Sequence, residues 1–264
     1  MTGVGTRPLV LIIGGLDPSG AGLQADIETC FSLGTHALPV ASALTVQTTR
    51  GLLRVVAVSP ETVHEQIKTI VSDVSPIAAC KIGMLPGRDM AEAVADALVM
   101  LSPECPVILD PVIRASSGGR LMGADLVDGL PEQLLQRVSL VKPNVAEALE
   151  LGWIGADMQP EWRRGQPRYM LLTGADVAAE STASHQLFEA GQLCLEIKQP
   201  VISGVFHGTG CTLTSAIAAY CALGLNLLEA VRAGLAFTWD SVSRGYSIGG
   251  GQLMPERRPA GHVK

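Results

Sequence analysis

The stretch Val205-Phe206-His207-Gly208-Thr209-Gly210-Cys211-Thr212-Leu213 is a glycine-rich turn that runs into an apolar segment. Leu213, Ile217 and Tyr220 recur at helical spacing, which predicts a helix that begins near Thr209. The N-terminus of a helix offers unpaired backbone N–H groups and a positive partial charge, and glycines let an anion approach that backbone closely. The stretch therefore predicts an anion cradle that leads into a helix.

Cys211 lies in the same turn, where the positive field of the helix N-terminus stabilises a thiolate. We expect a lowered thiol pKa, and a reactivity above that of the buried cysteines. The turn would then supply a base or nucleophile beside the anion cradle. The competing interpretation is a plain glycine-rich loop beside an inert buried cysteine, and the segment alone does not choose between the two.

Short apolar runs alternate with longer helical patterns along the chain, which is typical of βαβ units around a parallel sheet. A β-hairpin is expected at 187–197, where Glu189-Ala190-Gly191-Gln192 would form the turn. No repeat or long linker is visible, so we expect a single domain over 1–264 with an irregular tail at 249–264. Strands are predicted at 9–13, 40–46, 78–82, 107–109, 140–141 and 169–172, and helices at 22–33, 60–74, 89–101, 124–136, 145–151, 209–223 and 227–243.

The composition places the chain among compact soluble proteins, with 47% hydrophobic and 17% charged residues over 264 positions. The net charge of −6, with no dense basic run, argues against nucleic acid or an anionic membrane as a partner. Six cysteines without a CxxC pair favour reduced thiols over a disulfide framework or a zinc site. No signal peptide or membrane-spanning stretch is apparent, so a cytoplasmic location is expected.

A second glycine-rich turn follows the first predicted strand, at 14–22. Its Gly20-Ala21-Gly22-Leu23-Gln24-Ala25 segment satisfies the dinucleotide fingerprint, which also requires an acidic residue about 20 positions further on. No acidic residue occurs between Glu28 and Glu61, so a dinucleotide site is rejected. The loop still lies at the carboxyl end of a strand, where α/β sheets bind ligands, and Asp17 is either a charge on that rim or a turn residue.

Polar side chains also follow two later strands. Asp110 ends the apolar run 107–109, and Asn144 and Glu147 follow 140–141, on one face of a first helical turn. Oxygen-bearing side chains at neighbouring strand ends could support a water-rich Mg²⁺ site. The alternative for Asn144 and Glu147 is helix capping, which explains these two residues better when they are taken alone.

Two further polar residues each allow a functional and a structural interpretation. Gln47, near the end of a predicted strand, carries the donor and the acceptor needed to bind an aminopyrimidine edge, or is simply a solvated strand end. Lys81 lies in an apolar strand, where a charged residue is either paired or functional.

Taken together, these segments resemble the hydroxymethylpyrimidine/phosphomethylpyrimidine kinases of thiamine biosynthesis, within the ribokinase-like superfamily. The resemblance implies an α/β fold, a three-layer α/β/α sandwich with a mostly parallel central sheet. It also implies an ATP- and Mg²⁺-dependent kinase that acts on a small pyrimidine. The kinase would form a homodimer. The matching segments occur in the family's order over most of the chain, at 15–20, 24–26, 43–47, 81–85, 110–112, 143–147 and 207–213.

The resemblance also implies roles for individual residues. Cys211 would take the proton from the substrate hydroxyl, while the backbone amides of Gly208, Thr209, Gly210 and Cys211 would stabilise charge on the phosphoryl oxygens. The nucleotide would contact Asp110, Asn144 and the position of Thr173, and Mg²⁺ would be held by Asp110, Asn144 and Glu147, the last two through water. The pyrimidine pocket would be lined by Gly15, Asp17, Ala21, Gln47 and Met84.

The chain departs from the family pattern at four places. Its first loop, Pro18-Ser19-Gly20-Ala21-Gly22, has one glycine fewer than is usual. Thr173 stands where the family typically has a phosphate-contacting lysine, whereas Lys142 stands where threonine is more usual. The segment 152–166 is also shorter than expected. Two alternatives to the pyrimidine kinase follow: a pyridoxal kinase, and a pyrimidine-binding sensor with weakened catalysis.

Overall fold

A nine-stranded sheet forms the centre of the computed structural model, which describes residues 6–116, 118–162, 165–175 and 181–259. The strand order is β3-β2-β1-β4-β5-β6-β7-β8-β9, and the six strands from β2 to β7 are parallel. The β2–β3, β7–β8 and β8–β9 pairs are antiparallel. The strands are β1 (Leu9–Leu16), β2 (His36–Thr48), β3 (Gly51–Ala57), β4 (Ala79–Ile82), β5 (Val107–Leu109), β6 (Leu140–Val141), β7 (Tyr169–Ala175), β8 (Thr182–Glu189) and β9 (Gln192–Pro200).

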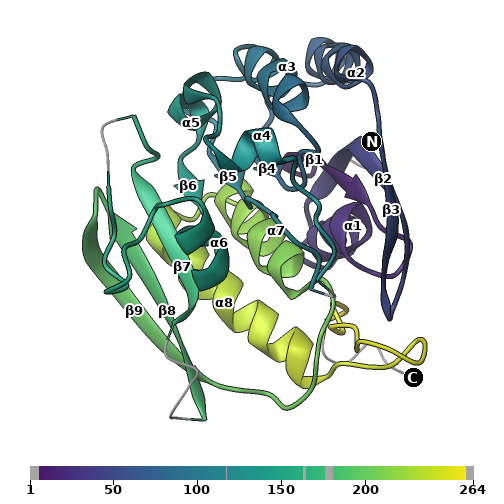
Figure 1. Ribbon diagram of the computed structural model, residues 1–264. Helices are drawn as coiled ribbons and strands as arrows, with labels where there is room; N and C mark the ends of the chain where they lie inside the picture. Colours follow the sequence, from purple (N-terminus) through teal and green to yellow (C-terminus); the bar gives the residue numbers. More distant parts are fainter. Residues whose placement is uncertain (1–5, 117, 163–164, 176–180, 260–264) are drawn as a thin grey trace.

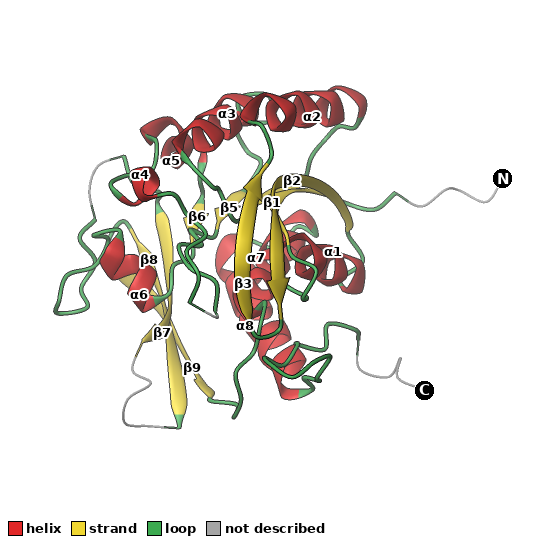
Figure 2. Ribbon diagram, turned by 45° about the vertical axis from the view of Figure 1, so that its right-hand side comes forward, coloured by secondary structure: helices red, strands yellow, loops and turns green. Residues whose placement is uncertain are grey.

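Helices cover both faces of this sheet (Figures 1 and 2). One layer contains α1 (Gly22–Ser32), α7 (Thr209–Ala222) and α8 (Leu227–Ser243), and the other contains α2 (Pro60–Asp73), α3 (Arg88–Leu98) and α5 (Glu132–Arg137). The short helices α4 (Ala124–Val127) and α6 (Val145–Glu150) complete the set of described helices. The predicted three-layer sandwich with a mostly parallel sheet is confirmed.

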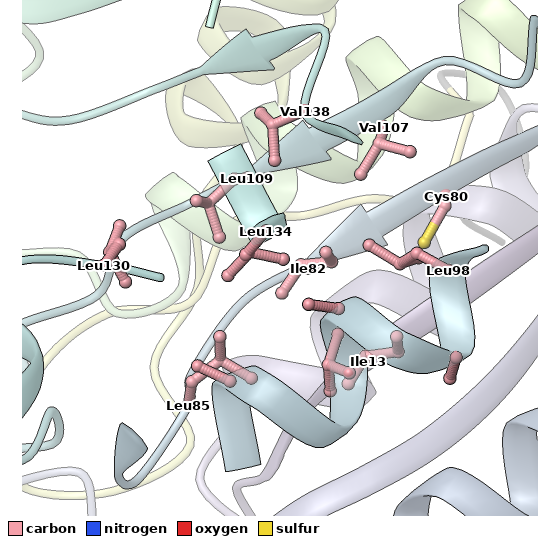
Figure 3. Close-up of a cluster of buried hydrophobic side chains, with 14 of the residues drawn as sticks. Ile13, Cys80, Ile82, Leu85, Leu98, Val107, Leu109, Leu130, Leu134 and Val138 are labelled. Atoms are coloured by element: carbon pink, nitrogen blue, oxygen red, sulfur yellow. The ribbon is translucent and has the colours of Figure 1, made fainter. Parts of the chain in front are cut away.

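The apolar strands explain why helices are needed on both faces. Successive side chains of β1 point to opposite sides, so Leu11 and Ile13 join one buried cluster while Val10 and Ile12 join the other. A strand buried on both faces is apolar at every position rather than at alternate ones. Figure 3 shows the first of these clusters, in which Ile13 lies among side chains of β4, β5, α3 and α5.

Two elements differ from the sequence prediction. β3 was not predicted, because it is an exposed edge strand without the apolar alternation that marks a half-buried one. The helix predicted at 124–136 is divided into α4 and α5, since Gly129 takes a φ of +149° and Pro131 forms the N-cap of α5. The other predicted strands and the hairpin are present, and Ala190-Gly191 forms the hairpin turn.

The tail that follows α8 is irregular, but its described part is firmly attached. Arg257 is buried and donates hydrogen bonds to Thr212 Oγ1 and to the Gly20 carbonyl oxygen, and it pairs with Glu28. These contacts tie the tail to α1, α7 and the first glycine-rich loop. None of the described helices is long and apolar enough to span a membrane.

Candidate active site

A cleft opens at the carboxyl ends of the parallel strands, beside the N-terminus of α7. Its cavity volume is about 210 Å³. Thr173 lies outside its lining, on a neighbouring cavity. All other residues proposed from the sequence line this cleft: Gly15, Asp17, Ala21, Gln47, Met84, Asp110, Asn144, Glu147, Gly208, Thr209, Gly210 and Cys211.

The start of α7 has the geometry of an anion cradle. Gly208 is the N-cap and adopts a left-handed conformation, with a φ of +79°. A Cβ at this position would lie 2.8 Å from the carbonyl oxygen of Gly20, so both the backbone angle and the space require glycine. The first N–H groups of a helix have no partners within it, and those of Thr209 and Gly210 belong to residues that line the cleft.

Cys211 lines the cleft in the first turn of α7, but its thiol is not activated as predicted. Burial raises the pKa of Cys211 to about 11; Lys81 opposes this rise, and the carboxylates of Asp26 and Asp110 add to it. The predicted lowering of the pKa was wrong, because burial and two buried carboxylates outweigh the helix N-terminus. The thiolate is therefore a minority species at neutral pH.

Asp110 and Lys142 form a buried ion pair at the ends of β5 and β6. Lys142 Nζ lies 2.9 Å from Asp110 Oδ1, and Thr214 of α7 donates a hydrogen bond to Asp110 Oδ2. Burial acts to lower the pKa of Lys142, but the carboxylates of Asp110 and Glu147 outweigh it and raise the pKa. Lys142 therefore stays positively charged beside the anion cradle, with the Asp110 carboxylate as its partner.

Asn144 and Glu147 form the capping box of α6. The Asn144 side chain accepts from the Glu147 backbone N–H at 2.9 Å, and the Glu147 carboxylate accepts from the Asn144 N–H at 2.9 Å. Burial raises the pKa of Glu147 to about 7, against the effect of Lys142 and the Asn144 N–H. The capping interpretation is thus confirmed, and both residues still line the cleft.

His207 and Asp17 connect the two glycine-rich turns. His207 Nε2 lies 2.5 Å from Asp17 Oδ2, and Ser116 Oγ lies 2.9 Å from His207 Nδ1. Burial acts against the Asp17 carboxylate, but hydrogen bonds from His207 and Ser19 outweigh it and lower the pKa of Asp17. Asp17 is thus a buried, charged anchor for the His207 ring.

Gln47 lies beside this ring in β2 and is buried, so it is not a solvated strand end. Its amide nitrogen lies 3.1 Å from His207 Nε2. A ring nitrogen that donates its proton to Asp17 cannot also accept one from the Gln47 N–H₂ group. The Gln47 N–H₂ group is then available to a ligand in the cleft.

Lys81 is the charged residue of β4, and the structure shows that it is paired. Its Nζ lies 2.8 Å from Asp26 Oδ2, both side chains are fully buried, and Ser215 donates to Asp26 Oδ1. Burial acts to lower the pKa of Lys81, but Asp26, Cys211 and Asp110 together outweigh it and raise the pKa. Lys81 lines the cleft and acts to lower the pKa of Cys211, whereas its partner Asp26 acts to raise it.

A second cavity lies next to the cleft and has a volume of about 360 Å³. Its lining comes from the ends of β6 and β7, from β8 and β9, and from α7 and α8, and it includes Thr173. Leu235, Trp239 and Val242 of α8 make one wall apolar. The two cavities share Lys142, Asn144, Thr209 and Gly210, so they meet at the anion cradle.

The roles of His207, Ser116 and Arg257 were missed in the sequence. His207 was noted only as a neighbour of the glycines, and its pairing with Asp17 joins residues 190 positions apart. No local pattern identifies such a partner. For Arg257, the sequence shows only a basic residue in a tail that begins with three glycines. Such a residue is more simply expected to be exposed to solvent.

Comparisons with known proteins show the family of this chain. A family model described as phosphomethylpyrimidine kinase matches residues 17–256. A hydroxymethylpyrimidine/phosphomethylpyrimidine kinase from Streptomyces coelicolor is 32% identical over 255 residues, which are 93% of each chain. One from Rhizobium meliloti is 37% identical over 244 residues, which cover 89% of this chain and 90% of that relative.

Solved structures share the fold. The phosphomethylpyrimidine kinase from Clostridium difficile has a TM-score of 0.72 at 26% identity and covers 90% of this chain and 100% of its own. The pyridoxal kinase from Staphylococcus aureus, solved with pyridoxal, has a TM-score of 0.82 at 19% identity and covers 98% and 97% of the two chains. At that identity the second likeness shows the fold alone.

Proposed function

Because the chain belongs to the phosphomethylpyrimidine kinase family, it is a phosphotransferase of thiamine biosynthesis, and we propose that its cleft phosphorylates 4-amino-5-hydroxymethyl-2-methylpyrimidine, its monophosphate, or both. ATP is the phosphoryl donor. The observation that carries this assignment is the meeting of two cavities at the start of α7. The smaller cleft takes the pyrimidine, and the neighbouring cavity takes the nucleotide.

The arrangement explains how the phosphoryl group can pass between the two cavities. With hydroxymethylpyrimidine the hydroxyl oxygen attacks the γ-phosphorus, the bond to the β,γ-bridging oxygen breaks, ADP leaves, and the hydroxyl proton passes to the thiolate of Cys211. With the monophosphate a phosphate oxygen of the substrate attacks instead, with the same leaving group, and needs no proton acceptor. The backbone N–H groups from Gly208 to Cys211 stabilise charge on the phosphoryl oxygens, so the protein acts by positioning and electrostatics.

Magnesium fits the donor set at the junction. Asp110 and Glu147 supply carboxylates and Asn144 supplies an amide, which suits an ion that keeps several waters. Among the residues that the structure describes, no group of three or more His, Cys, Asp or Glu side chains is placed to hold a metal ion. When bound, Mg²⁺ would neutralise charge on the phosphates of the nucleotide. The turnover assay below therefore includes Mg²⁺.

Gln47→Leu should weaken binding of the pyrimidine. The variant removes an amide that is buried beside His207 and available to the ring, and an unpaired ligand group costs about 1–3 kcal/mol. Calorimetry should show reduced pyrimidine affinity with nearly unchanged ATP affinity. Equal pyrimidine binding by variant and parent would place the pyrimidine elsewhere.

Side-by-side turnover of three substrates tests the function itself. Parent protein with ATP and Mg²⁺ should phosphorylate hydroxymethylpyrimidine or its monophosphate with a higher kcat/KM than pyridoxal. A clear preference for pyridoxal would overturn the substrate assignment. Pyrimidine binding without any turnover would instead establish a sensor, the alternative raised by Thr173 and the short first loop.

We also propose a cytoplasmic homodimer. Leu16, Leu44, Val46 and Val56 lie on one face of the neighbouring strands β1, β2 and β3, and each is between 40% and 44% exposed. A contiguous exposed apolar face of this kind suits an interface between copies. Sedimentation should give twice the chain mass of 27.6 kDa, and a monomer mass would exclude this assembly.

A further inference from the structure

Lys142 occupies the junction of the two cavities. It follows β6, and its side chain is buried while lining both the pyrimidine cleft and the neighbouring cavity. A Cβ at Gly210 would lie only 3.1 Å from Lys142 Nζ, so the ammonium lies against the backbone of the anion cradle. The Lys142 ammonium therefore lies where a phosphoryl group would pass from one cavity to the other.

The bonding of Lys142 leaves capacity for a ligand. An ammonium has three N–H donors, and Asp110 Oδ1 is the acceptor that pairs with it, at 2.9 Å. Since Lys142 lines both cavities, its other donors can reach a ligand there. Among the described residues that line the larger cavity, Lys142 is also the one lysine or arginine. The terminal phosphate of a nucleotide in that cavity has no other cationic side chain of its lining within reach.

We propose that Lys142 binds the phosphoryl group while it is transferred, by turning donors from Asp110 to the γ-phosphate oxygens. The inference rests on the proposed function and adds a residue role to it. Asp110 and the proposed γ-phosphate position both lie at the junction of the two cavities. The Lys142 ammonium can therefore contact either one without leaving its buried site. The step moves no electrons at Lys142, which stays an ammonium and stabilises charge as the hydroxyl oxygen bonds to phosphorus and ADP leaves.

Thr173 lies close enough to Lys142 for a lysine at position 173 to replace its charge. Its backbone N–H donates to the Pro143 carbonyl oxygen at 3.1 Å, next to Lys142, and its side chain lines the larger cavity. A lysine at 173 would thus approach the same junction from β7. This gives a rescue that a merely structural role of Lys142 does not predict.

The test compares nucleotide affinities in parent, Lys142→Met, Lys142→Gln and Lys68→Met proteins. Lys68 is an exposed lysine of α2, and its replacement removes the same charge outside the cleft. Loss of a charged hydrogen bond should weaken a non-hydrolysable ATP analogue on the order of 10–100-fold in the Lys142 variants. ADP and pyrimidine affinities should be nearly unchanged, and kcat/KM for ATP should fall in parallel. Adding Thr173→Lys to Lys142→Met should restore part of the loss.

Several outcomes would overturn the proposal. Parent-like affinity of Lys142→Gln for the analogue would do so, and so would an equal loss of ADP and analogue affinity. If the variants fail to fold, the parent structure with the bound analogue decides, since Nζ should contact a γ-phosphate oxygen. Contact with Asp110 alone would contradict the role. A parent that turns over no substrate would instead show that the proposed function is wrong.

Discussion

Cys211→Ser should lower kcat by roughly 10²–10⁴-fold, the usual contribution of a positioned proton acceptor. Serine keeps the size of the side chain and leaves the backbone N–H groups of α7 in place. It supplies practically no deprotonated form to accept the proton, because its hydroxyl is much less acidic than a thiol. Affinities for ATP and the pyrimidine should therefore persist while turnover collapses. Single-turnover kinetics at saturating substrates measure the effect on the chemical step.

The pH profile separates a proton acceptor from a residue that merely fits. A pKa of Cys211 raised to about 11 means that the thiolate fraction in the free enzyme grows as the pH rises from 7 toward 10. The parent kcat/KM should grow with it, since this parameter reports groups of the free enzyme, and the serine variant should lack this gain. Cys221→Ser, at the other end of α7, is the matched control. Parent-like turnover of Cys211→Ser with chemistry rate-limiting would leave the Gly208–Gly210 amides as the catalytic part.

Lys81→Met should lower the free energy of unfolding by about 3–5 kcal/mol, because it leaves Asp26 as an uncompensated buried charge. Both side chains are fully buried, so water cannot replace the lost partner. A loss of this size is a large part of the stability of an ordinary domain. Equilibrium unfolding in denaturant would measure it.

Two further variants show whether the loss comes from the buried charge. Adding Asp26→Leu to Lys81→Met removes both charges and should recover much of the stability, as replacement of buried pairs by apolar residues often does. Arg168→Met breaks an exposed pair with Glu189 and should change little. An unfolding free energy of Lys81→Met equal to that of the parent would mean that Asp26 is neutral or otherwise compensated.

The fold was largely predictable because its strands are short apolar runs between helical patterns. Runs such as 9–13 and 107–109 are apolar at every position, which marks strands covered on both faces. β3 escaped prediction because an exposed edge strand carries no such signal. The break between α4 and α5 lies at Gly129 and Pro131, which are residue types that interrupt a helix.

The site was predictable in its parts and not in its electrostatics. Glycines and strand-end polar residues located the lining of the cleft, and the structure brings them together. The pKa of Cys211 depends on Asp26 and Asp110, which lie 185 and 101 positions earlier in the chain. Spacing along one sequence shows a helix N-terminus but not which distant carboxylates face it. The predicted catalytic and binding roles stay predictions.

The structure of the protein with hydroxymethylpyrimidine and a non-hydrolysable ATP analogue tests most directly whether phosphoryl transfer takes place at the start of α7. The γ-phosphate should accept hydrogen bonds from the backbone N–H groups between Gly208 and Cys211, at about 2.7–3.2 Å. The pyrimidine should lie beside Gln47 with its hydroxyl group facing Cys211. A nucleotide whose γ-phosphate lies outside the junction of the two cavities, or a pyrimidine bound away from Gln47, would contradict the proposed active site.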